Sequence, residues 1–139
     1  MRGPEGGVMA DDGKRLFDTL IGDATNGDLT VKLDPQGFVQ IDQACEQYKA
    51  ELRGIRNEVR TIARHDNWGL GDDQPDMVSA KQLVQHFRDK ASGGENNAYD
   101  ILQEYIDTAE QVQTMFKTVR DNYVRTDDTF AAELRRITT

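Results

Sequence analysis

The chain has 139 residues, of which 37% are hydrophobic and 30% charged, and 25 acidic residues outnumber 17 basic ones to give a formal net charge of −8. No run of roughly 18 apolar residues occurs, so the sequence predicts no membrane-spanning segment. The surplus of carboxylates disfavours nucleic acid as a partner, because phosphate would be repelled. The single cysteine, Cys45, permits no internal disulfide.

Residues that carry chemistry are sparse. The two histidines, His65 and His86, have no acid or cysteine at metal-ligand spacing. No nucleophile elbow, phosphate loop or paired-histidine zinc motif is found. We therefore expect no catalytic residue, no metal, no cofactor and no enzymatic activity. No apolar stretch follows residues 1–7, so no Sec-type signal peptide is expected either.

Residues 1–33 are predicted to form an N-terminal extension that is partly flexible. The first 13 residues hold four glycines and a proline and few large apolar groups, which predicts a mobile leader. The apolar spacing over residues 16–21 predicts one or two helical turns, and Asn26-Gly27 predicts a turn. An alternating apolar pattern predicts a short strand at Leu29, Val31 and Leu33.

An apolar stripe with steps of three and four residues runs through residues 34–66 and predicts a helix of about 30 residues lying along another helix. Asp34 before Pro35 predicts the N-terminal cap and first turn of this helix. The stretch 67–75, rich in glycine and aspartate, predicts its end. The stripe alternates between heptad positions a and d, with Lys49 and Arg56 at e, and comprises Phe38, Ile41, Cys45, Tyr48, Leu52, Ile55, Val59 and Ile62.

A second stripe lies near the other end of the chain, in a helix that Asn97 and Asp100 are predicted to cap. It is wider than a single helical partner requires, because Ile101, Ile106 and Met115 flank it, and this width predicts a second buried face. Phe130 and Leu134 continue the helical spacing towards the C-terminus. The stripe itself comprises Leu102, Tyr105, Ala109, Val112, Phe116, Val119 and Tyr123.

Between the two stripes, apolar spacing over residues 80–91 predicts a shorter helical segment. It is interrupted at Ser92-Gly93-Gly94, where the glycines either break the helix or only kink it. Together these elements predict an all-α fold, in which residues 34–139 form an antiparallel helical hairpin with its turn near 67–75. Two such coiled-coil hairpins are expected to pair into a four-helix bundle. The residues of both stripes other than Cys45, Ala109 and Tyr123, together with Ile106 and Met115, are the expected hairpin or dimer interface.

The only tryptophan stands in the predicted turn, in Trp68-Gly69-Leu70-Gly71. A helical hairpin with such a turn resembles the WXG-motif (ESAT-like) family, the small substrates of type VII (ESX) secretion, although Leu70 stands where the strict motif has glycine. A second family feature, a tyrosine followed four residues later by an acid, matches Tyr123 and Asp127. The spacing predicts that both side chains lie on one helix face.

The resemblance implies a non-enzymatic protein that is secreted by a Sec-independent route, pairs with itself or a related hairpin, and has a type VII secretion ATPase as a partner. It implies a turn motif at Trp68, Gly69 and Gly71 and a secretion signal at Tyr123 and Asp127. The same sequence features are also compatible with another function, that of a cytoplasmic coiled-coil adaptor or regulatory protein. In that case Trp68 only covers the end of the hairpin core, Tyr123 packs in the core, and Asp127 is a solvated acid.

Overall fold

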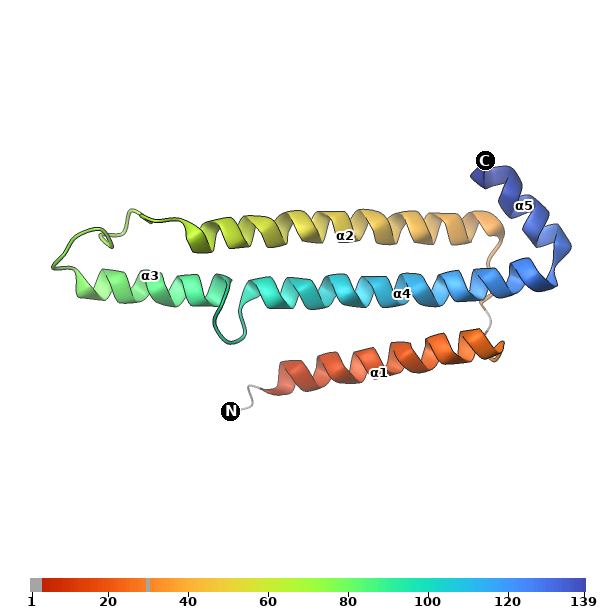
Figure 1. The fold of residues 1–139 in the computed structure, drawn as a ribbon, viewed down its shortest axis with the longest axis horizontal. Coiled ribbons are helices and arrows are strands. Elements are labelled where there is room, and N and C mark those ends of the chain that lie inside the picture. The colour runs from red at the N-terminus through yellow and green to blue at the C-terminus, as the bar shows by residue number, and fades with distance from the viewer. Residues whose placement is uncertain (1–3, 30) are drawn as a thin grey trace. The chain divides into compact units, whose positions relative to one another are not determined.

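The computed structural model describes residues 4–29 and 31–139, with side chains from Arg15 onward. The predicted all-α class is confirmed, because the regular structure of these residues consists of five helices (Figure 1). No helix in this part of the chain combines the length and the apolar content that crossing a bilayer requires. The helices are α1 (Pro4–Asn26), α2 (Pro35–Arg64), α3 (Val78–Ala91), α4 (Ala98–Thr126) and α5 (Asp128–Thr138).

The predicted first long helix is confirmed in both its start and its length. Helix α2 spans 30 residues from Pro35 to Arg64. The backbone N–H of Gly37 donates to Asp34 Oδ1 at 2.8 Å, so Asp34 is the N-terminal cap and Pro35 takes the first helical position, where a missing N–H costs nothing.

The glycines between α3 and α4 break the helix rather than kink it. Helix α3 ends at Ala91 and α4 begins at Ala98, and Figure 1 shows the connecting turn bulging away from both helices. Gly93 has φ of 93°, a conformation that favours glycine. Asn97 is 1% exposed, and its Oδ1 accepts from the backbone N–H of Asp100 at 2.9 Å, which confirms the predicted cap.

The N-terminal predictions are corrected in two places. Residues 4–13, predicted to be a mobile leader, lie in α1. The predicted turn at Asn26-Gly27 is confirmed, because α1 ends at Asn26 and Gly27 has φ of 81°. The predicted strand is wrong: no strand is assigned at residues 29 or 31–33, and the described residues offer no second strand to pair with. Instead, a hydrophobic core takes up Leu29, Val31 and Leu33.

The described residues divide into two compact units. Unit 1 consists of residues 4–29, 31–49 and 107–139, and unit 2 of residues 50–106. In unit 1, Asp42 of α2 pairs with Lys117 of α4, and seven residues further along α2, Lys49 pairs with Glu110, seven residues back along α4. These two segments are therefore antiparallel. In unit 2 the segments of α2 and α4 are antiparallel as well, since Arg56 contacts Gln103 and Arg60 contacts Tyr99.

The core of unit 1 is built around Phe38, which is 3% exposed. Its ring lies 5.7 Å from that of Phe130, 6.0 Å from Tyr123 and 6.5 Å from Phe116, measured between ring centroids. Such tilted and edge-to-face pairs add to the free energy of burial. Ala24 and Val119 complete the buried cluster, so α1, α2, α4 and α5 all contribute to it.

Candidate interaction surfaces and signal residues

The predicted signal residues Tyr123 and Asp127 do not share a helix face in this structure. Helix α4 ends at Thr126, and Asp127 has extended backbone angles of φ −136° and ψ 103°. Its Oδ1 accepts from the backbone N–H of Phe130 at 3.0 Å, so Asp127 is the N-terminal cap of α5. A spacing of four residues places two side chains on one face only within a continuous helix, whereas here the chain turns at Asp127 and Phe130 is buried in the core.

Tyr123 is half-buried in the aromatic core of unit 1. Its ring stacks on Phe130 at 5.1 Å between centroids, with 23° between the planes. Another part of the side chain lines an open hollow of about 290 Å³ that Thr25, Leu29, Asn122 and Arg125 also border. The structural alternative for Tyr123, packing in the core, is therefore supported, while Asp127 has a capping role that the sequence pattern did not reveal.

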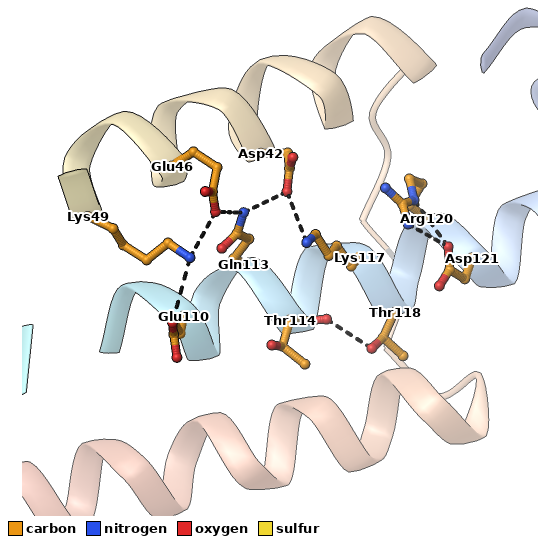
Figure 2. Close-up of polar contacts among 10 residues, drawn as sticks. All are labelled: Asp42, Glu46, Lys49, Glu110, Gln113, Thr114, Lys117, Thr118, Arg120 and Asp121. Atoms are coloured by element: carbon orange, nitrogen blue, oxygen red, sulfur yellow. Dashed lines mark hydrogen bonds and ion pairs between the residues drawn. The ribbon is translucent and has the colours of Figure 1, made fainter. Parts of the chain in front are cut away.

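A polar layer separates α2 from α4 in unit 1, as Figure 2 shows. Lys49 is 6% exposed and Gln113 5%. Gln113 Nε2 donates to Asp42 Oδ1 at 2.8 Å and to Glu46 Oε2 at 2.7 Å. Lys49 Nζ lies 2.8 Å from Glu46 Oε2 and 3.8 Å from a carboxylate oxygen of Glu110. Through these four contacts, the buried side chain of Gln113 has partners on the facing helix, and that of Lys49 has one partner on the facing helix and one on its own.

The layer also changes the pKa of two of its neighbouring groups, the Glu46 carboxyl and the Cys45 thiol. Hydrogen bonds from Lys49 and then Gln113 hold the pKa of the Glu46 carboxyl below its ordinary value, because they favour the charged form. Burial, followed by the charge of Asp42, raises the pKa of the nearby Cys45 thiol. Cys45 is thus kept as a neutral thiol of low reactivity.

The buried face of α2 is rotated from the predicted one. Lys49, at heptad position e, is buried, whereas Tyr48, Ile55 and Ile62, at position d, are 50%, 48% and 52% exposed. In the unit 2 part of α4, Ile106 at e is 3% exposed and Tyr105 at d is 52% exposed; in unit 1, by contrast, Val119 at d is 1% exposed and belongs to the core. Apart from Val119, the helices meet mainly through positions a and e. The steps of three and four residues located the stripe but not the side of it that faces the partner.

The predicted interface residues accordingly fall into three classes. The buried ones are Phe38, Leu52, Ile106, Met115 and Val119; the half-buried ones are Ile41, Val59, Leu102, Val112 and Phe116; and the exposed ones are Tyr48, Ile55, Ile62 and Tyr105.

The loop after α2 is organised around Trp68, whose ring stacks on Phe87 of α3 at 6.0 Å between centroids. Its indole Nε1 donates to the carbonyl of His65 at 3.1 Å, and its backbone N–H donates to Asp72 Oδ2 at 3.1 Å. That backbone bond lowers the pKa of the Asp72 carboxyl. Arg88 Nη2 donates to the carbonyls of His65 and Asp66 at 2.5 and 2.7 Å, so α3 satisfies acceptors that the end of α2 leaves open.

The backbone conformation of the loop explains why glycine stands at both glycine positions of the predicted turn motif. Gly69 and Gly71 have φ of 76° and 92°, a region that side chains with a Cβ rarely adopt. A Cβ at Gly71 would also stand 2.8 Å from the sulfur of Met77. Leu70, between them, needs no such conformation and is 48% exposed.

Unit 2 leaves much apolar surface uncovered. Of the side chains that the structure describes, nine large hydrophobic ones in this unit are exposed, whereas three apolar ones, Leu52, Val84 and Ile106, are buried. The exposed set comprises Ile55, Ile62, Leu70, Met77, Val78, Leu83, Phe87, Ile101 and Tyr105. Within the described residues, no three histidine, cysteine or acidic side chains come together as a metal site. The feature of unit 2 best suited to a function is therefore this apolar surface.

Comparison with known proteins identifies no relative: no family model matches the chain, and no curated protein or solved structure matches it either.

Proposed function

We propose that this protein is a non-enzymatic helical-hairpin protein that acts by pairing with another helical hairpin, either a second copy or a related protein, to form a four-helix bundle. The observation that carries the proposal is the exposed apolar surface of unit 2. Large exposed apolar patches are rare on soluble monomers and are typical of protein–protein interfaces. The antiparallel contacts of α2 with α4 inside each unit support the hairpin.

Four of the nine exposed residues of unit 2 have a regular placement on α2 and α4. Ile55 and Ile62 lie on α2 and Tyr105 on α4, all at position d, directly beside the a and e positions through which the helices meet. In an antiparallel pair that meets through a and e, the two d rows lie on the same side. These residues, with Ile101 beside Tyr105, can therefore form one apolar strip. Because each side chain is already about half buried, a partner helix laid along the strip would gain about 0.8–1.5 kcal/mol for each one covered, half the value for full burial.

We further propose that the protein is a type VII (ESX)-like secreted protein that leaves the cell by a Sec-independent route, with a secretion ATPase as its export partner. The support is the resemblance of the Trp68-Gly69 turn and of the Tyr123–Asp127 pair to the WXG-motif family. The glycine conformations at residues 69 and 71 agree with a turn of this kind. A cytoplasmic coiled-coil adaptor remains the competing function, and the export experiment separates the two.

Replacing both Ile55 and Ile62 by glutamine is expected to convert a dimer into a monomer. Glutamine keeps the helix but removes the apolar area that a partner would cover. Sedimentation velocity at micromolar concentration measures the change, with circular dichroism to verify that the helical content is retained. Asn57→Gln, at an exposed position of the same helix, is the matched control and should leave the dimer intact. A wild-type protein that is monomeric with full helical signal, and that takes up no helical partner, contradicts the pairing.

Tyr123→Phe and Asp127→Asn are expected to reduce export into the culture medium while the protein stays folded. Phenylalanine keeps the stack on Phe130, and asparagine keeps the cap of α5, so each variant removes only the hydroxyl or the charge that a receptor would read. Immunoblots of culture filtrate and cell lysate measure the partition, and Asp128→Asn is the control for loss of a nearby charge. Undiminished export of both variants removes the signal assignment, and a wild-type protein found only in the lysate supports the adaptor.

A further inference from the structure

We propose that α5 is a latch that opens when α4 and α5 straighten into one helix, and that this opening brings Tyr123 and Asp127 onto one helix face. The inference rests on the proposed function for the role of these two residues. Its structural basis is the junction between the helices in unit 1, where the chain changes direction from α4 to α5 (Figure 1). A single residue, Asp127, separates the two helices.

The junction is held by few interactions. The backbone N–H of Asp127 donates to the carbonyl of Tyr123 at 2.8 Å and so continues the hydrogen bonding of α4. Its carboxylate accepts from the N–H of Phe130 and its carbonyl accepts from the N–H of Ala131 at 3.0 Å, and both bonds belong to α5. Asp127 therefore takes part in both helices. We call the observed arrangement, with α4 and α5 as separate helices, the bent form, and the side-chain cap favours it by about 1 kcal/mol.

The sequence permits the straight form. Residues 124–129 contain neither glycine nor proline, and Phe130 follows Tyr123 by seven residues, so one continuous helix would place the two rings on the same side. The bent form is favoured by tertiary contacts, because Phe130 and Ala131 are 8% and 7% exposed and Phe130 packs against Phe38. The Asp127 cap and the burial of Phe130 and Ala131 thus favour the bent form over a straight, continuous helix.

The bent form cannot present the pair as a helical motif. The ring of Tyr123 is stacked on Phe130, and the Asp127 carboxylate is bonded to the first turn of α5. In a continuous helix the residues would be four apart on one face, and a groove could read the ring and the carboxylate together. The latch is therefore a means of withholding the signal until a partner selects the straight form.

A proline at residue 128 distinguishes straightening from simple detachment of α5. Asp128 is the first residue of α5, where proline is favoured, and Asp127 before it already has the extended backbone that a following proline requires. In a continuous helix the same proline would lose a backbone hydrogen bond and clash with the preceding turn. Asp128→Pro is thus compatible with the bent form and excludes the straight one.

Thiol labelling of a cysteine on the buried side of α5 measures opening. Ala131→Cys, in a Cys45→Ala background, puts one thiol at a position that is closed in the bent form, and Ala132→Cys at the adjacent exposed position is the control for intrinsic reactivity. We expect Asp127→Ala to speed labelling of residue 131 about five-fold, by loss of the cap, relative to Asp127→Asn. We expect Asp128→Pro to slow it strongly and to leave labelling of residue 132 unchanged. Equal labelling with and without the proline overturns the latch.

Export of the Asp128→Pro protein tests the second half of the proposal. This variant keeps both Tyr123 and Asp127, so we expect loss of export together with slow labelling. Normal export with slow labelling shows that the straight form is not what the export machinery reads, and overturns that half. If the wild-type protein is not exported at all, the proposed secretory function fails, and the labelling result still decides whether the latch exists.

Discussion

Replacing Phe38 by alanine is expected to lower the free energy of unfolding by about 3–5 kcal/mol, the usual loss for a fully buried phenylalanine. The ring is 3% exposed and lies within 6.5 Å, between centroids, of three other aromatic rings contributed by α4 and α5. Its removal leaves a cavity in the aromatic cluster that the surrounding side chains fill only in part. Urea unfolding followed by circular dichroism measures the loss.

Leu16→Ala is the matched control for Phe38→Ala, because Leu16 is 57% exposed on α1 and alanine is a better helix former. The control should change the free energy of unfolding by no more than about 0.5 kcal/mol. If Phe38→Ala costs as little as the control, the aromatic cluster is not the core of unit 1.

Gln113→Leu is expected to cost about 1–3 kcal/mol, although it replaces a buried polar side chain by an apolar one of similar size. The substitution removes the donors for Asp42 and Glu46, and a hydrogen bond to a charged group contributes about 1.5–3 kcal/mol. Two such hydrogen bonds are lost, and burial of the leucine offsets only part of their combined contribution, about 1.5–3 kcal/mol at most. Urea unfolding again supplies the measurement.

Two companion variants make the Gln113 result interpretable. Gln82→Leu is the same replacement at an exposed position of α3 and should be nearly neutral. Adding Glu46→Ala to Gln113→Leu should cost less than the sum of the two single changes, because it removes one of the acceptors left without its donor. Strict additivity of the two changes would mean that the hydrogen bond between Gln113 and Glu46, drawn in Figure 2, contributes nothing to stability.

The polar layer has a second expected role, in the register of the two helices. An apolar stripe alone tolerates sliding by a turn, whereas Gln113 can reach both Asp42 and Glu46 in only one alignment. Buried polar residues at helix interfaces are known to fix register in this way. Lys117, 3.6 Å from Asp42, and Lys49, 3.8 Å from Glu110, strengthen the same alignment from either side.

Local sequence determined the helices that have strong signals at their ends. Asp34 and Pro35 fixed the start of α2, and the glycine-rich stretch beyond Arg64 fixed its end. Asn97 likewise marked the start of α4. These signals are reliable because a cap satisfies backbone groups within three residues of itself, so its effect does not depend on distant parts of the chain.

Only the tertiary structure decided which side of each stripe is buried and where the last helix turns. A spacing of three and four residues defines a stripe about two positions wide, and it is contact with the partner helix that selects a and e over a and d. Asp127 is compatible with both a helix interior and a cap, so the choice rests with Phe130, which finds Phe38 across more than 90 residues of sequence. The same core takes up Leu29, Val31 and Leu33, whose alternation predicted a strand, because the described residues supply no strand to pair with and the helices offer an apolar surface.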